Sequence, residues 1–277
     1  MVQIVTDSSS LYKVEEAREL GFESIPLCVH IEEWEGRDLQ MDMKEFYDRI
    51  RRGQIPKSSQ PPIGEVVELY EAYPEDEIIN IAMADGLSGT YHSACSAREM
   101  VDNREHITVF NSRTLCGPHR YMVEKAQQMK TEGKSAAEIL EWLKEAAEKT
   151  ESFLIPQDFS FLRRGGRLTP VAAALGSVLK LKPVMTLTKD GKRLDKFMVK
   201  RTMSSAVAGI LAYLKEKKLD ARHIVYIAHA DALEDAKQVA AQIRAALGEL
   251  DIRFLELSPA FVTQGGPRCV AIQYIER

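Results

Sequence analysis

Serine and threonine gather in three short clusters, each where the sequence pattern predicts the start of a helix. The clusters are TDSSS at 6–10, SSQPP at 58–62 and LSGTYHSA at 87–94. A helix N-terminus presents unpaired backbone N–H groups and a partial positive charge, and hydroxyl side chains placed there cap the helix or help to bind an anion. With the basic segment FLRRGGRL at 161–168, these clusters predict a pocket for a ligand with a carboxylate or phosphate head.

Each cluster also has a purely structural interpretation, because serine and threonine are ordinary helix caps. The first cluster directly follows a predicted strand, at the edge where open α/β sheets bind ligands. In the second, the prolines suit the first turn of a helix, so Ser59 or Gln60 would be the cap and Ser58 could point elsewhere. In the third, Gly89 permits close approach of the backbone. The candidate ligand contacts in these clusters are Thr6, Asp7, Ser8, Ser58, Ser59, Gln60, Ser88, Gly89 and Thr90.

Catalysis by Ser88 is disfavoured, and we predict no catalytic residue. The G-x-S-x-G elbow of hydrolases fails because Thr90 occupies the position of the second glycine. Asp85 and His92 are near in the sequence, but a histidine four residues along a helix is an unusual source for a triad. The chain also has no P-loop and no G-x-G-x-x-G fingerprint. A small-molecule phosphotransferase or hydrolase that uses the same clusters stays as the alternative.

Arginines and glycines mark further candidate sites in the second half of the chain. The arginines of FLRRGGRL could hold a phosphate or contact a partner, or they could lie on a solvated turn. Arg201, at the end of the predicted strand LDKFMVK, could reach a buried carboxylate. QGGPR at 264–268 predicts a tight turn whose backbone can approach a ligand. The apolar run from Ala172 to Val178 is either core or the lining of an apolar tunnel. These segments add Arg163, Arg164, Arg167, Gln264, Gly265 and Gly266 to the candidates.

Composition and charge disfavour several classes of protein. The 277 residues suggest two domains or one large α/β unit. The net charge of −4 argues against a nucleic-acid-binding regulator, which only the RRGGR cluster favours. There is no run of about 18 apolar residues, so no membrane-spanning helix is expected. The N-terminus runs directly into a strand pattern without a signal peptide, which predicts a cytoplasmic protein. Cysteines and histidines lack metal-ligand spacing, so we expect no metal, no cofactor and reduced thiols.

The first half of the chain alternates predicted strands and helices. This pattern indicates a doubly wound, mostly parallel α/β domain at 1–150. Strands are expected at 2–6, 24–31, 77–84 and 107–112, and helices at 11–20, 42–52, 64–73, 88–101, 116–132 and 135–148, with Asp42 as the cap of the second helix.

In the second half, the predicted strands bunch together. The pattern indicates an α+β domain at 151–277 with a mixed or antiparallel sheet, and Asp190-Gly191 predicts a hairpin turn. Strands are expected at 152–156, 183–188, 194–200, 223–230, 252–258 and 269–275, and the long helices at 202–218 and 232–247.

Taken in order, these motifs resemble the DegV family. The matching segments, which extend over residues 3–275, are VTDSSS, SSQPP, LSGTYHSA, FNSRT, DFSFLRRGGRL, LKLKPV and GGP. The resemblance implies two α/β domains with a long-chain fatty acid held in a tunnel between them. It also implies that the protein is not an enzyme, and that it presents the carboxylate to a separate fatty-acid kinase, which forms the acyl phosphate.

The resemblance assigns roles to particular residues. The head-group hydroxyls fall on Ser58 and Ser88, and the head-group arginine falls on Arg201. The arginines of FLRRGGRL become candidates for contact with the kinase or its phosphoryl donor. The chain departs from the family pattern with Ser58 for a threonine, Asn111 for an aspartate, Gln264 for a histidine near the head group, and Arg268 for a glycine. A relative that binds a different anionic lipid is therefore a further alternative.

Overall fold

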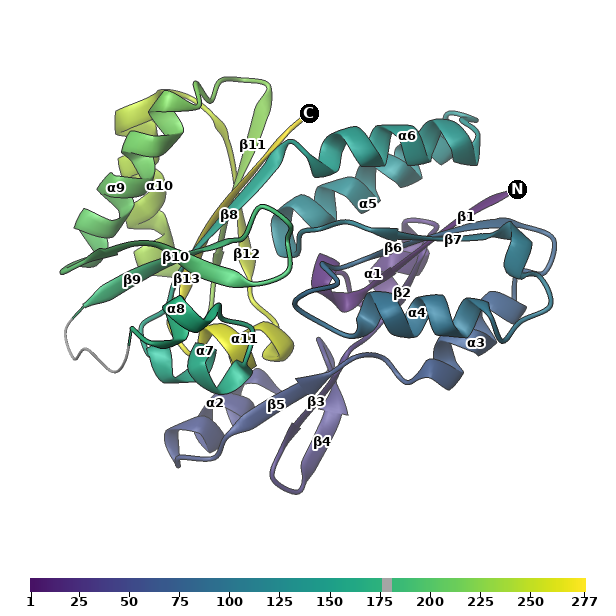
Figure 1. The fold of residues 1–277 in the computed structure, drawn as a ribbon, viewed down its shortest axis with the longest axis horizontal. Helices are drawn as coiled ribbons and strands as arrows, with labels where there is room; N and C mark the ends of the chain where they lie inside the picture. The colour runs from purple at the N-terminus through teal and green to yellow at the C-terminus, as the bar shows by residue number, and fades with distance from the viewer. Residues whose placement is uncertain (176–180) are drawn as a thin grey trace. The chain divides into compact units, whose positions relative to one another are not determined.

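A parallel sheet organises the first half of the chain (Figure 1). The computed structural model describes residues 1–175 and 181–277, which divide into a unit Met1–Glu148 and a unit Lys149–Arg277. In the first unit the strand order is β2-β1-β6-β7, and all neighbours are parallel. The order changes direction between β1 and β6, so their carboxyl ends form the switch point at which such sheets bind ligands. The predicted doubly wound sheet is confirmed; its strands are Glu23–Ile25, Val2–Asp7, Glu77–Ala82 and Ile107–Asn111.

Helices of the first unit follow the predicted ranges with one notable shift. The helix α2 begins as predicted, because the Asp42 carboxylate accepts the N–H groups of Lys44 at 2.8 Å and Glu45 at 3.1 Å. The helix α1 is shorter than predicted, since Ser8–Ser10 form the 3-10 turn η1 and Leu11 has a φ of 60°. The helices are α1 (Val14–Glu19), α2 (Met43–Arg51), α3 (Ile63–Glu71), α4 (Thr90–Arg98), α5 (Cys116–Thr131) and α6 (Ala136–Ala147), with a second 3-10 turn, η2 (Arg104–His106).

The prediction of a single strand at 24–31 is wrong. The chain leaves the parallel sheet after β2, passes through Pro26 and enters a second sheet as β3 (Cys28–Ile31). Proline has no N–H group to offer to a ladder, which explains the break. The strand β3 pairs antiparallel with β4 (Trp34–Arg37) and β5 (Pro56–Ser59). Two segments for which no strand was predicted, β4 and β5, therefore belong to a small three-stranded sheet.

The second unit contains a six-stranded mixed sheet in the order β10-β9-β8-β13-β11-β12. The pair β11 and β12 is parallel and every other neighbouring pair is antiparallel, which confirms the predicted α+β class. The turn between β9 and β10 is the predicted hairpin, with Gly191 at a φ of 70°. The strands are β8 (Thr150–Ile155), β9 (Lys182–Leu187), β10 (Leu194–Lys200), β11 (His223–His229), β12 (Asp251–Glu256) and β13 (Val270–Glu276).

Both long helices of the second unit are confirmed, as α9 (Met203–Glu216) and α10 (Leu233–Leu247), and their buried apolar residues belong to the core that the sheet also lines. Two segments predicted to be turns are instead partly helical. FLRRGGRL contributes to α7 (Phe159–Gly165), and QGGPR contributes to α11 (Pro259–Gly265). A short helix α8 (Pro170–Ala173) follows α7. No helix within the described ranges combines the length and hydrophobicity needed to cross a membrane.

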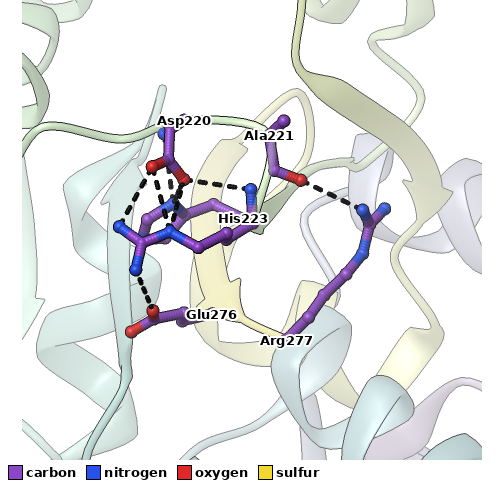
Figure 2. Close-up of polar contacts among 6 residues, drawn as sticks. Asp220, Ala221, His223, Glu276 and Arg277 are labelled. Atoms are coloured by element: carbon purple, nitrogen blue, oxygen red, sulfur yellow. Dashed lines mark hydrogen bonds and ion pairs between the residues drawn. The ribbon is translucent and has the colours of Figure 1, made fainter.

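A network of charged side chains joins the beginning of β11 to the end of β13 (Figure 2). Arg222 bonds the Asp220 carboxylate through Nε at 3.0 Å and lies 3.2 Å from Glu276 Oε1. Arg277 donates to the carbonyl oxygen of Ala221 at 3.1 Å. The side chain of Arg222 is 67% exposed, so water screens these ion pairs and each contributes little to stability. We interpret this network as local support for the turn that precedes β11.

Candidate ligand-binding site

The carboxylate of Asp7 ties the carboxyl ends of β1 and β6 together. One oxygen accepts the N–H of Ser9 at 2.9 Å, and the other accepts the N–H of Met83 at 3.0 Å, just beyond the end of β6. Asp7 is only 2% exposed. A buried charge needs such hydrogen bonds, so this carboxylate has a structural function at the switch point.

His119, on α5, contacts the same two strand ends from within the core. Its Nε2 lies 3.0 Å from the carbonyl oxygen of Ile81, and its Nδ1 lies 2.8 Å from Oγ of Ser9. A carbonyl oxygen only accepts, so Nε2 carries the hydrogen and Nδ1 accepts from the serine hydroxyl. Burial lowers the pKa of His119, although the nearby Asp7 carboxylate opposes this effect. The ring is therefore neutral at neutral pH.

The other side chains of the first cluster are also bonded internally. The hydroxyl of Ser8 donates to Asp38 at 2.7 Å and accepts the N–H of Leu27 at 3.1 Å. The hydroxyl of Thr6 donates to the carbonyl oxygen of Ile81 at 3.0 Å. Thr6 and Ser8 are each 1% exposed, so these bonds give them a supporting position beneath the strand ends. Direct contact of Thr6, Asp7 or Ser8 with a ligand stays a prediction.

The second cluster forms the strand β5 and its exit. Ser58 pairs with Val29, and Ser59 pairs with Cys28. The predicted capping of α3 by Ser59 or Gln60 is wrong, because the N-cap is Pro62 and no side chain bonds there. The strand ladder reaches Ser59, and this places the start of the helix too far along the chain for either side chain to cap it. Ser59 and Gln60 are exposed, and Ser58 is half-buried.

The third cluster surrounds the start of α4. Oγ of Ser88 lies 2.8 Å from Oγ1 of Thr90 and accepts the N–H of Thr90 at 3.3 Å. The helix begins two residues later than its predicted start near Ser88. Ser88 is half-buried, whereas Thr90 is buried. The engagement of Ser88 with Thr90 is that of a helix-terminal hydroxyl and not of a nucleophile held by a base.

An open pocket of about 590 Å³ brings parts of the second and third clusters together. A Cβ atom at Gly89 would come within 2.8 Å of Oε1 of Gln60, so the absence of a side chain at Gly89 leaves room for the Gln60 amide in this position. The polar groups around the pocket are hydroxyls, an amide, an imidazole and a thiol, which suit hydrogen bonding to an anion without a fixed cation. The pocket is lined by Cys28, Ser59, Gln60, Pro61, Pro62, Ile63, Gly89, His92, Ser93 and Ser96.

In the second unit, the structure brings the FLRRGGRL and QGGPR segments together. The side chain of Gln264 on α11 lies over Gly165 at the end of α7, where a Cβ atom would clash with Oε1 of Gln264. A Cβ atom at Gly266 would similarly meet the ring of Phe161 at 2.9 Å. A Cβ atom at Gly265 would come within 2.7 Å of the Sγ atom of Cys269. Gly165 and Gly266 therefore allow α7 and the α11 segment to pack closely.

The arginines of the second unit are largely exposed. Arg163 and Arg164 lie in the last turn of α7, and the guanidinium of Arg164 stacks 4.6 Å from the ring centre of Phe161. Arg167 is half-buried and donates to the carbonyl oxygen of Gly165. Arg201 is exposed and lies between β10 and the N-cap of α9.

The predicted apolar lining is described only in part. Ala172 is buried on α8, whereas residues 176–180, which include Val178, lie outside the described residues. In the described part of the chain, no group of three or more histidine, cysteine or acidic residues is arranged to hold a metal ion.

His119 and Asp38 were not among the residues predicted from the sequence. The two residues come from distant parts of the chain, and only the fold brings them to the first cluster. One usable signal was present, because the helix after β7 must begin at the carboxyl edge of the sheet, and His119 is in its first turn.

Comparisons with known proteins identify the family. The model of a family described as uncharacterised proteins of the DegV family matches residues 1–277. A DegV domain-containing protein of Halalkalibacterium halodurans is 30% identical over 283 residues, which cover 100% of this chain and 99% of the relative. The crystal structure of DegV from Bacillus subtilis, described as a fatty acid binding protein, has a TM-score of 0.86 and 30% identity, covering 100% of this chain and 99% of that one. A DegV family protein from Thermus thermophilus, whose structure is described in terms of fatty acid binding, has a TM-score of 0.89 and 25% identity over 100% and 99% of the two chains.

These matches extend over the whole chain. The chain belongs to the DegV family.

Proposed function

We propose that this protein binds a long-chain fatty acid and presents its carboxylate to a separate kinase, without catalysing a reaction itself. The observation that carries the proposal is the full-length similarity, at 30% identity, to a DegV protein described as a fatty acid binding protein. A ligand with one carboxylate also agrees with the first and third hydroxyl-rich clusters, which follow the strands β1 and β6 of the parallel sheet.

The proposed head-group ligands are Ser58, Ser88 and Arg201. When the hydroxyl of Thr90 donates to Ser88, the hydrogen of Ser88 is left to donate to a carboxylate oxygen. Arg201 supplies the positive charge that a carboxylate requires when it leaves water. Gln60 and Gln264 offer amides, which donate hydrogen bonds but do not carry charge. The backbone next to Gly89, Gly265 and Gly266 completes the proposed contacts.

The acyl chain supplies most of the proposed affinity. Burying about sixteen methylene groups contributes roughly 13 kcal/mol, at about 0.8 kcal/mol for each. Loss of translational and rotational freedom opposes this by about 4–15 kcal/mol. The chain therefore provides affinity, and the polar head group provides orientation.

The proposed kinase contact is the basic surface formed by Arg163, Arg164 and Arg167. Arg163 and Arg164 are exposed on the last turn of α7, where their guanidinium groups are accessible to a partner or to the phosphates of its nucleotide. Acyl phosphate formation transfers the terminal phosphoryl group of the nucleotide to the carboxylate oxygen, and the nucleoside diphosphate leaves. The partner kinase, and not this chain, performs that transfer.

Equilibrium titration with a labelled fatty acid tests the binding proposal. We expect saturation at one ligand for each chain, and competition by unlabelled fatty acids. Absence of saturable binding, or turnover of a phosphorylated substrate by the isolated protein, would reject it.

A further inference from the structure

Two buried side chains link the ends of β1 and β6, and the proposed head-group contacts use neither of them. Asp7 accepts the N–H of Met83, and His119 donates to the carbonyl oxygen of Ile81. Both also bond Ser9: Asp7 accepts its N–H at 2.9 Å, and Nδ1 of His119 lies 2.8 Å from its hydroxyl oxygen. His119 is fully buried. Asp7 and His119 thus form a clamp across the switch point of the sheet.

The clamp holds the end of β6, where the β6–α4 loop begins, and Ser88 lies in this loop. Ile81 and Met83 flank Ala82, the last residue of β6. The chain then turns through a bond from the N–H of Leu87 to the carbonyl oxygen of Ala84 at 3.1 Å, and Ser88 follows directly.

The opposite side of this loop is held by the segment that follows β7. The N–H of Ala84 donates to the carbonyl oxygen of Thr114 at 2.9 Å. The β6–α4 loop is therefore fixed at its root from both neighbouring strands, and on the β1 side the polar contacts come from Asp7, Thr6 and His119.

We propose that His119 is a positioning residue, which sets the location of the Ser88 hydroxyl by holding the end of β6 against the end of β1. This inference rests on the proposed function, because the group that it positions is the proposed carboxylate ligand. Misplacing that hydroxyl weakens a charge-assisted hydrogen bond but leaves contacts with the acyl chain unchanged. His119 therefore affects head-group discrimination more than total binding.

The two nitrogens of His119 have separate functions, which amide substitutions distinguish. A glutamine amide reaches the position of Nε2 and can still donate to Ile81, so His119→Gln retains the link to β6. An asparagine amide reaches only the position of Nδ1, so His119→Asn retains the link to Ser9 and loses the link to β6.

The test compares the binding of hexadecanoic acid and hexadecan-1-ol, which share a chain and differ in the head group. We expect His119→Asn to lower the acid-to-alcohol affinity ratio about tenfold, the loss of one charge-assisted hydrogen bond. His119→Gln should keep the ratio within about threefold of the wild type, because the Ile81 link is retained. His106→Gln is the matched control, since His106 is exposed on η2 and should leave the ratio unchanged.

Three results would overturn the inference. An unchanged ratio in His119→Asn, with or without a lower melting temperature, would mean that His119 is only structural. If that variant does not fold, Ser9→Ala and His119→Gln each remove the Ser9 bond and keep the Ile81 link, and a tenfold fall of the ratio in either of them would contradict the assignment of the effect to that link. A wild-type protein that binds neither compound would reject the proposed function itself, and this inference with it.

Discussion

Gln264 on α11 lies against Gly165 on α7, so closely that no side chain larger than hydrogen fits at position 165 without displacing the amide. The contact joins the candidate head-group amide to the helix that carries Arg163 and Arg164. The two segments are almost 100 residues apart, and yet their glycines determine how closely they pack.

Gly165→Ala tests whether the position of Gln264 matters for binding. The blocking atom is the end of a flexible side chain, and alanine favours helix, so we expect the free energy of unfolding to change by less than about 1 kcal/mol. Affinity for fatty acid should fall by the same factor as in Gln264→Ala, and the double variant should add nothing further. Gly64→Ala on α3, where a Cβ atom meets open space, is the control. Wild-type affinity in Gly165→Ala would show that the amide does not contact the ligand.

Ser88→Ala and Arg201→Ala test the head-group assignment. Each substitution should cost roughly 1.5–3 kcal/mol of fatty acid binding, the contribution of a charge-assisted hydrogen bond. Arg201 is exposed, so its loss should leave the melting temperature unchanged, and Arg104→Ala serves as an exposed control. Isothermal titration with one fatty acid measures the effect. Unchanged affinity in both variants would reject the assignment.

Charge reversal at Arg163 and Arg164 tests the proposed kinase surface. Replacing both residues with glutamate should reduce acyl phosphate formation in the presence of a fatty-acid kinase, because the variant repels the partner or its nucleotide. Fatty acid binding should stay at the wild-type level. Equal loss of binding and phosphorylation would instead indicate that the segment is needed for folding.

His119 predicts a pH dependence of stability. Burial lowers its pKa in the folded protein, whereas the unfolded chain has the ordinary value of 6.5. The unfolded state therefore binds more protons as the pH falls below that value, and the free energy of unfolding decreases by up to about 1.4 kcal/mol for each pH unit. Chemical denaturation between pH 8 and pH 5 should show a shallower slope for His119→Gln. Identical slopes would mean that His119 is protonated in the folded protein as readily as in the unfolded chain.

The periodic segments of the chain were predicted well because burial determines their pattern. The apolar strand EIINIA and the helix capped by Asp42 form where local signals and packing agree. The prediction of one strand at 24–31 failed at Pro26, because apolar residues on both sides of the proline belong to strands of two different sheets. Prediction from the sequence failed again at FLRRGGRL and QGGPR, where glycines that indicate turns instead allow two short helices to pack.

The sequence offered residue types for the candidate site but not their geometry. The first cluster, with Asp7 and Ser8, lies at the carboxyl end of β1, as its place directly after a predicted strand indicated. Their hydrogen bonds to Asp38 and His119 depend on tertiary contacts, and no local pattern reports such contacts. A buried polar cluster and a ligand site have the same composition, and the two differ only in which atoms are already bonded.

Mass spectrometry of an organic extract from the natively purified protein tests the central claim most directly. The account predicts a fatty acid in an amount close to one molecule for each chain, and its mass would identify the chain length and the number of double bonds. Protein that is empty after purification and also fails to bind added fatty acids would contradict the account, and would assign the hydroxyl-rich clusters to another anionic ligand.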